Sequence, residues 1–262
     1  MKKFGAQIVC YEDSGFLAEA VLRVYPLMHR ILFLVGTDPW YGKGDRQFPK
    51  ATLGKIMEMD DPDGKFMVVS KRWESEHQER NEGMRILHGE GCEWALLLDD
   101  DEMFNRSELF TMMEHISRAA WSNGRASAFL VRQLIYWKNR ETVIENLTGA
   151  MPHFFSTQPG DVFFTSGKAF NILGGVFNDI NEENLVLHHL SYVRDEAQMR
   201  RRFSWFTHAP DVKEEWIDRV WKNWTPEMTN LHPMNPDSFT RAVPASSVPW
   251  QLENMPGRIR RR

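Results

Sequence analysis

Residues 91–104 read GCEWALLLDDDEMF, and they contain the most informative transition in the chain. The apolar run at 94–98 is long enough for one buried strand, and four acidic residues follow it directly. A buried strand has to end where carboxylates begin, because an unpaired charge is costly to bury. We therefore expect the acids at 99–102 to lie at the carboxyl end of that strand, which is the edge where open α/β sheets bind ligands.

Four adjacent carboxylates repel one another unless a cation or hydrogen-bond donors hold them. Hard oxygen ligands of this kind suit Mg²⁺ or Mn²⁺, particularly when a diphosphate supplies the remaining ligands. The plain alternative is a solvated acidic loop that caps the next helix. A strictly apolar strand directly before the acids favours the metal site, so Mn²⁺ or Mg²⁺ is the predicted cofactor.

Strand and helix signals alternate along the first hundred residues. Strands are predicted at 7–11, 30–35, 65–70 and 94–98, and helices at 16–25 and 76–88. This alternation predicts an α/β fold with a mostly parallel central sheet and helices on both of its faces. Residues 1–104 are then expected to form a nucleotide-binding half.

The pattern is less regular in the second half. Helices are predicted at 107–121, 195–208 and 212–224, strands at 126–137 and 184–190, and an aromatic, loop-rich stretch at 154–170. Pro, Asn and Ser accumulate after residue 224, so we expect an extended tail at 225–262 that wraps the domain or is partly mobile. The 262 residues thus read as one domain, 1–224, with an appended segment.

Composition excludes several classes of protein. No apolar stretch approaches the roughly 20 residues that span a bilayer, and the amino terminus reaches acidic residues too early for a signal peptide. Cys10 and Cys92 cannot form a disulfide framework, which together with the missing leader predicts a cytoplasmic protein. The formal charge of −4 argues against a generally basic nucleic-acid binder, although arginines cluster at 200–202 and 258–262.

Four short segments follow one another in order. They are 9–12 (VCYE) at a strand end, 78–83 (QERNEG) on a helix, 99–101 (DDD) after a strand, and 188–194 (HHLSYVR) before a basic helix. The ordered set resembles glycosyltransferases with the GT-A fold, close to the broad family-2 type. In that family an Arg-Asn-x-Gly helix precedes an Asp-x-Asp motif, and a later segment closes the metal and diphosphate site in some members. The resemblance spans residues 4–208 and is thin between 105 and 185.

The resemblance implies roles for the acidic motif. Asp101 would bind the metal ion directly and serve catalysis, because the ion neutralises the diphosphate leaving group. Asp99 would contact the ribose, or the metal through water. Asp100 would point the other way, toward the ribose or a neighbouring loop, and residues 105–224 would form the half that closes the metal site and holds the acceptor.

Two adjacent histidines are candidates for a further metal ligand. Because His188 and His189 lie next to each other on a predicted strand, their side chains face opposite sides of the sheet. Only one of them can look into the site, and the other is a packed residue. The resemblance places a third metal ligand at this position, and the spacing to the following Ser191 favours His189.

Further contacts to the nucleotide are implied by the resemblance. Arg80 would contact base or phosphate, although an ion pair with Glu76 four residues earlier is an equal alternative. Arg194 and the 200–202 run could clamp a diphosphate, since guanidinium groups match phosphate oxygens, but only one or two of these arginines can face inward. The remaining candidates, at the ends of the first two strands, are Cys10, Tyr11, Glu12 and Asp38.

The catalytic base is less clearly marked. Glu182 and Glu183 precede the histidine strand, and either could deprotonate an acceptor hydroxyl. The Glu-Asp dipeptide that often supplies the base in inverting members of the family has no clear counterpart, so the stereochemical outcome stays open.

The sequence therefore predicts a metal-dependent glycosyltransferase with a nucleotide-sugar donor, linked to UDP. The acceptor stays open between a glycan, a lipid-linked sugar, a protein and hydroxymethylated DNA, with DNA the minority reading. One alternative is a sugar-phosphate nucleotidyltransferase. That class needs a Gly-rich phosphate loop after the first strand, whereas this chain has an acidic turn, EDSG, at 12–15. A non-catalytic binding module that keeps the fold is the other alternative.

Overall fold

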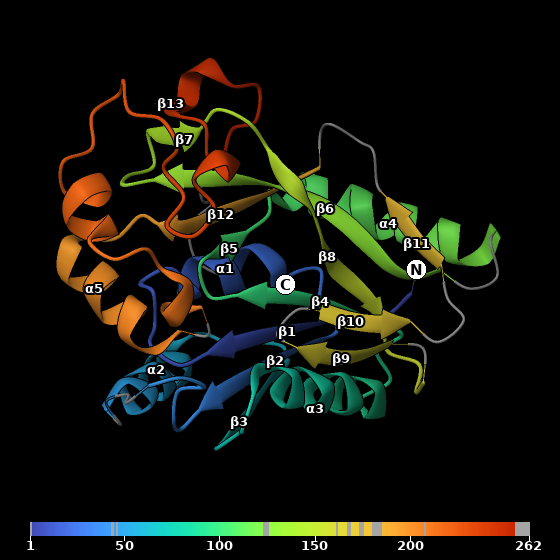
Figure 1. Ribbon diagram of the computed structural model, residues 1–262. Coiled ribbons are helices and arrows are strands. Elements are labelled where there is room, and N and C mark those ends of the chain that lie inside the picture. The colour runs from blue at the N-terminus through green and yellow to red at the C-terminus, as the bar shows by residue number, and fades with distance from the viewer. Residues whose placement is uncertain are drawn as a thin grey trace.

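The computed structural model of this protein describes residues 2–42, 45, 47–122, 126–160, 162–166, 169–172, 176–179, 185–206 and 208–254. Its parallel half is built from four strands, namely β1 (Phe4–Cys10), β2 (Arg30–Gly36), β3 (Phe66–Lys71) and β4 (Trp94–Asp99). They pair in the spatial order β3-β2-β1-β4 (Figure 1). Every residue of β1 is buried, as the continuous apolar runs predicted.

Helices cover both faces of this parallel half. Buried side chains of α1 (Leu17–Val24), α2 (Gln47–Glu58) and α4 (Arg106–Ser122) pack on one face, against the even-numbered residues of β1. Helix α3 (Glu76–Gly89) packs on the other face (Figure 1). The predicted α/β class, with a mostly parallel central sheet flanked by helices, is confirmed.

The sheet continues beyond β4 with a mixed half. Strand β8 (Thr148–Ser156) runs antiparallel to both β4 and β6 (Ala126–Trp137), and β12 (Val186–Tyr192) pairs in parallel with β6. The short strand β5 (Glu102–Met103) directly follows the acidic motif and pairs with β12. The smaller strands are β7 (Thr142–Ile144), β9 (Val162–Ser166), β10 (Ala169–Ile172), β11 (Val176–Asp179) and β13 (Ala242–Pro244).

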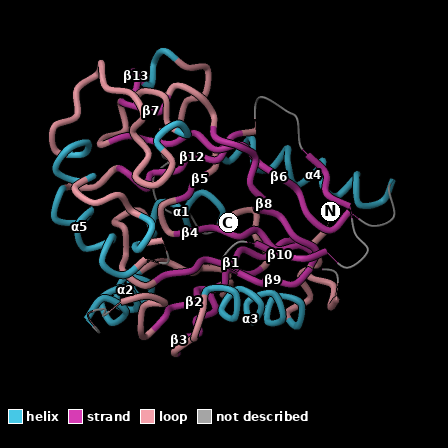
Figure 2. The backbone as a smooth tube through the Cα atoms, in the orientation of Figure 1, coloured by secondary structure: helices cyan, strands magenta, loops and turns pink. Residues whose placement is uncertain are grey.

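The C-terminal third is mostly loop, as Figure 2 shows between α5 (Glu196–Trp205) and β13. Short turns lie at Ala209–Asp211, Ile217–Trp221, Pro236–Ser238 and Ala245–Ser247. Strand β13 pairs antiparallel with β7, so residues 225–254 wrap back onto the mixed half. An aromatic core around Trp137, Trp216 and Trp221 joins this segment to β6.

Several predicted elements differ from the structure. The predicted helix at 212–224 is wrong, because Glu215 has a φ of 60° that interrupts the helix, and only one turn forms at Ile217–Trp221. The stretch at 154–170 holds the end of β8 together with β9 and the start of β10, rather than mainly loop. Helix α2 has no counterpart among the predictions, since its weakly amphipathic sequence carries Pro49 in the first turn, where proline is tolerated.

The described part of the chain contains no helix with the length and apolar character needed to cross a membrane.

Candidate functional site

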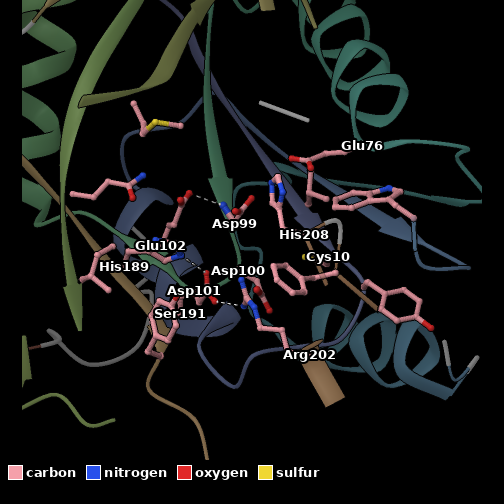
Figure 3. A pocket seen from close by; sticks show the side chains of 18 of the residues that line it. Cys10, Glu76, Asp99, Asp100, Asp101, Glu102, His189, Ser191, Arg202 and His208 are labelled. Atoms are coloured by element: carbon pink, nitrogen blue, oxygen red, sulfur yellow. Dashed lines mark hydrogen bonds and ion pairs between the residues drawn. The ribbon is translucent and has the colours of Figure 1, made fainter. Parts of the chain in front are cut away.

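A cavity of about 700 Å³ lies at the carboxyl ends of β1, β2 and β4. The parallel register brings these strand ends level, with Val9 opposite Asp99 and Cys10 opposite Val35. The acidic motif, His189 and Arg202 gather on one side of the cavity (Figure 3). Nine of the predicted site residues line it: Cys10, Tyr11, Glu12, Asp38, Arg80, Asp99, Asp100, Asp101 and His189.

Asp101 is the most heavily engaged of the acids, and only 1% of the residue is exposed. Its Oδ2 atom accepts hydrogen bonds from Arg194, at 2.8 Å, and from Arg202, at 2.9 Å. Burial alone would raise the pKa of Asp101, but Arg202, His189 and Arg194 together hold that pKa well below its usual range. The carboxylate is therefore ionised. Of the four arginines at 194 and 200–202, two form hydrogen bonds with it.

The two histidines separate as strand alternation predicts. His189 lines the cavity, and its Nε2 atom lies 3.3 Å from Asp101 Oδ1. His188 is fully buried on the other side, with Nδ1 3.0 Å from the hydroxyl of Tyr136 and Nε2 3.5 Å from the amide nitrogen of Asn105. Burial, with a smaller effect of Arg23, lowers the pKa of His188 to about 3. His188 is thus a neutral packed side chain that is not brought to the site.

The donor atoms beside Asp101 fit a divalent cation only in part. Among the described residues, no three His, Cys, Asp or Glu side chains converge on one point. However, Asp101 Oδ1 and the ring nitrogens of His189 are buried and have no hydrogen-bond partner, so the 3.3 Å approach is not a hydrogen bond. A Mg²⁺ or Mn²⁺ ion that also takes phosphate oxygens and water needs only one or two protein ligands. The pair can supply them.

Arg80 is buried at the base of the site, where it contacts two carboxylates. Its guanidinium donates to Glu76 at 2.8 Å and to Asp99 at 2.9 Å, so the ion pair with Glu76 forms, whereas contact with a base or phosphate stays a prediction. Burial would lower the pKa of Arg80, but Glu76 and Asp99 raise it. One nitrogen, Nη1, is buried without a partner. The neighbouring Glu79 also lines the cavity, and burial raises its pKa well above the usual range.

Asp100 points toward a neighbouring loop, one of its two predicted directions. Its Oδ2 atom accepts a hydrogen bond of 2.6 Å from the backbone N–H of Ser14, and the Ser14 hydroxyl donates to the Asp100 carbonyl. Burial and the charge of Asp101 raise the pKa of Asp100 to about 7. Glu102, fully buried, accepts a hydrogen bond from the backbone N–H of Asp99 and so closes the acidic turn on itself.

The end of β1 is tied to α5. Glu12 accepts hydrogen bonds from Arg201, at 3.0 Å, and from the indole of Trp205, at 3.1 Å. The Tyr11 ring lies 5.0 Å from the Trp205 ring, and its hydroxyl donates to the carbonyl of Asp45. Helix α5, which contributes Arg202 and Trp205 to the cavity lining, is therefore held through Glu12 at one point and through Asp101 at another.

The two remaining predicted nucleotide contacts, Cys10 and Asp38, form few interactions with other side chains of the site. Cys10 is buried, and burial raises the pKa of its thiol well above the usual range, so it is not a thiolate. Asp38 accepts a hydrogen bond from the Thr37 hydroxyl at 3.0 Å and lines the cavity at the end of β2. Glu182 and Glu183 lie outside the described residues.

Some cavity residues had no signal in the sequence. Trp40 and Trp205 line it, whereas Trp73 and Trp137 are buried in the core. The tail also reaches the cavity, with His232, Met234, Ser238 and Phe239.

No family model and no curated protein matches the sequence. Solved structures resemble the fold at low identity. S. aureus TarS 1–349 in complex with UDP-GlcNAc is 13% identical, with a TM-score of 0.44, over 74% of this chain and 59% of that chain. A second structure of S. aureus TarS 1–349 is 12% identical, with a TM-score of 0.43, over 83% and 75%.

A CMP:2-keto-3-deoxy-manno-octonic acid synthetase complexed with CTP is 9% identical, with a TM-score of 0.34, over 60% of this chain and 75% of that one. The chain thus spans about three fifths of the first TarS structure. Similarities this low do not decide a family, a substrate or a reaction.

Proposed function

We propose that this protein is a metal-dependent glycosyltransferase that transfers a sugar from a UDP-linked donor to an acceptor hydroxyl. The observation that carries the proposal is the meeting of Asp101, His189 and Arg202 at the strand-end cavity. A carboxylate, an imidazole and a guanidinium are together the groups that hold a divalent cation and the diphosphate it binds.

Each part of the site has a role in this proposal. Cys10, Tyr11 and Asp38 contact the base and ribose at the ends of β1 and β2, while Arg80 holds Asp99 in place from below. Asp101 and His189 would hold the metal ion, which when bound would neutralise the charge that develops on the leaving diphosphate. Arg202 lies within reach of the same phosphates, as a second positive group beside the cation.

The turn after β1 disfavours the nucleotidyltransferase alternative. A phosphate cradle needs free backbone N–H groups. Here the N–H of Asp13 donates to Thr52, that of Ser14 donates to Asp100, and that of Phe16 donates to the Ser14 hydroxyl. Three backbone N–H groups of this turn are therefore already used by the protein itself.

Binding of the nucleotide tests the proposal directly. Calorimetric titration of UDP should show much tighter binding with Mn²⁺ than with excess EDTA. A thermal-shift screen of nucleotide sugars with Mn²⁺ should then identify the donor, since a ligand of the folded state raises the melting temperature. Equal UDP affinity with Mn²⁺ and with EDTA would count against a metal-dependent site, and no UDP binding under either condition would refute the donor.

A further inference from the structure

The lining of the cavity divides into a charged part and an uncharged part. The charged side chains come from the turn after β1, the loop after β2, α3, the acidic motif and α5. Among the described residues, the lining contributed by β6, by residues 147–151 and by the loop at 232–239 carries no formal charge. We call this surface the uncharged wall; its polar and larger apolar members are Gln133, Ile135, Leu147, Thr148, Met151, His232, Met234, Ser238 and Phe239.

The loop that completes the uncharged wall is held in a closed form. The N–H of Leu231 donates to the carbonyl of Phe239 at 2.9 Å, and the N–H of Asn230 donates to that of Thr240. The indole of Trp216 donates to the Leu231 carbonyl at 3.0 Å from the aromatic core behind it. The loop is therefore anchored at both ends without any ligand, so the wall is preorganised.

His232 presents a hydrogen-bond donor from this wall. Its Nδ1 atom accepts hydrogen bonds from the backbone N–H groups of Met234, at 3.1 Å, and Asn235, at 2.9 Å. Because Nδ1 is an acceptor, the ring proton has to lie on Nε2. The ring also packs edge-on against Phe239, with centroids 4.5 Å apart, and burial lowers the pKa of His232 to about 4. The group is thus a neutral N–H donor at neutral pH.

From this division we propose that the uncharged wall binds the acceptor, and that the acceptor is a neutral carbohydrate rather than a polyanion. The inference rests on the proposed glycosyltransferase function. Sugar hydroxyls can accept from His232 and exchange hydrogen bonds with Thr148 and Ser238, while the apolar face of a sugar ring packs on Met151 and Phe239. A phosphate would lose its hydration here without gaining a cation, and would lie close to the acidic motif.

Saturation-transfer NMR tests which class of ligand the wall binds. The full chain, saturated with UDP and Mn²⁺, is mixed with methyl glycosides of glucose, galactose and N-acetylglucosamine, and separately with a short DNA duplex. We expect saturation transfer to at least one glycoside and none to the duplex at physiological salt. The glycoside signal should persist when UDP is replaced by an intact UDP-sugar, because the acceptor and the donor sugar occupy different places.

Two pairs of variants tie the signal to the wall. His232→Asn retains an acceptor near the Nδ1 position but lacks the Nε2–H, so it should weaken glycoside binding at least fivefold. His232→Gln retains a donor near Nε2 and should stay within about twofold of the parent. Both Ser238 and Asn235 are exposed, but only Ser238 lines the cavity. Ser238→Asp places a charge in the wall and should abolish the signal, whereas Asn235→Asp places the same charge outside the lining and should not.

Each contrary outcome has a distinct meaning. The acceptor assignment is overturned if UDP binds but no glycoside does. It is also overturned if the DNA duplex binds the parent protein and this binding is lost in Ser238→Asp. In both cases the glycosyltransferase proposal stands. The assignment is also overturned if an intact UDP-sugar removes the glycoside signal, since the ring then occupies the place of the donor sugar. Glycoside binding that is the same in all four variants overturns it as well. Absence of UDP binding in a calorimetric control overturns both proposals.

Discussion

The Nε2 atom of His189 lies 3.3 Å from the Oδ1 atom of Asp101, and neither atom has a hydrogen-bond partner. Asp101 lies in the turn between β4 and β5, and His189 lies on β12. The pairing of β5 with β12 sets His189 opposite Glu102 and so brings it next to Asp101. Burying two polar atoms face to face without a hydrogen bond is costly. A cation between them would remove that cost, which is why the pair is the centre of the predictions below.

Asp101→Asn should abolish Mn²⁺-dependent UDP binding and sugar transfer, because an amide is a poor metal ligand. It should also lower the free energy of unfolding by about 3 kcal/mol, since Arg194 and Arg202 lose their buried counter-ion. Urea unfolding and calorimetry measure the two effects. The matched control is Asp218→Asn, which breaks an exposed pair with Arg200 and should cost less than about 1 kcal/mol. Transfer at a near-parental rate in Asp101→Asn would refute the role of this residue.

The two histidines should respond differently to alanine. His189→Ala should weaken Mn²⁺-dependent UDP binding more than tenfold and leave stability nearly unchanged. His188→Ala should leave the nucleotide affinity intact but cost about 2–3 kcal/mol, because it opens a cavity and strands the partners of a buried imidazole. Calorimetry and urea unfolding on both variants decide between them. Loss of metal-dependent binding in His188→Ala instead would mean that the strand register is wrong by one residue.

Gly42→Ala should perturb α5, unlike a matched glycine substitution elsewhere. Gly42 has a φ of 70°, and a Cβ built there would overlap the carbonyl oxygen of Ser204 near the end of α5. Gly64 has a similar φ of 63° but open space around it. Both alanines should cost about 1 kcal/mol for the left-handed backbone, and only Gly42→Ala should add roughly 1–3 kcal/mol of overpacking.

The same pair reports on the cavity. Because α5 contributes Arg202 and Trp205 to the lining, Gly42→Ala should also weaken UDP binding severalfold, whereas Gly64→Ala should not. Equal urea midpoints and equal UDP affinities for the two variants would show that the approach of Gly42 to α5 does not constrain the site.

Acid should destabilise the loop at 232–239. The folded-state pKa of His232 is about 4, below the ordinary value, because burial disfavours the charged ring. A depressed folded pKa contributes stability that is present above the unfolded pKa of about 6.5 and is lost as the pH falls toward 4. Between pH 7 and pH 5, the free energy of unfolding should therefore fall by roughly 1–2 kcal/mol less in His232→Asn than in the parent protein.

Urea unfolding at both pH values, in the parent and in His232→Asn, checks this expectation. His188 titrates in the same direction but is present in both proteins, so it cancels in the comparison. An identical loss of stability in the two proteins would show that His232 is not held neutral by the loop.

Much of the parallel half could be predicted from sequence, and the reason is local. A strand buried on both faces has to be a continuous apolar run, so β2 and β4 are readable without their partners, and the acids after β4 mark where the strand stops. Alternation along a strand likewise settles that His188 and His189 face opposite sides. These features depend on neighbouring residues in the chain alone.

What the sequence could not decide depends on contacts between distant segments. Helix α2 carries too weak an apolar stripe to be read alone, and Glu215 breaks a helix that the apolar spacing favoured. No local pattern indicates that Trp137 is buried while Trp205 lines the cavity.

The organisation of the site is likewise tertiary. The sequence by itself determined that a buried strand ends in carboxylates and that the two adjacent histidines face opposite sides of the sheet. Only the tertiary structure decided that Arg194 and Arg202 share the Oδ2 atom of Asp101, and that the tail returns to place His232 in the cavity wall. The two arginines that bind Asp101 are 93 and 101 positions away from it in the chain. Whether such distant residues meet depends on how whole helices and strands pack, and the local spacing of residue types does not encode that packing.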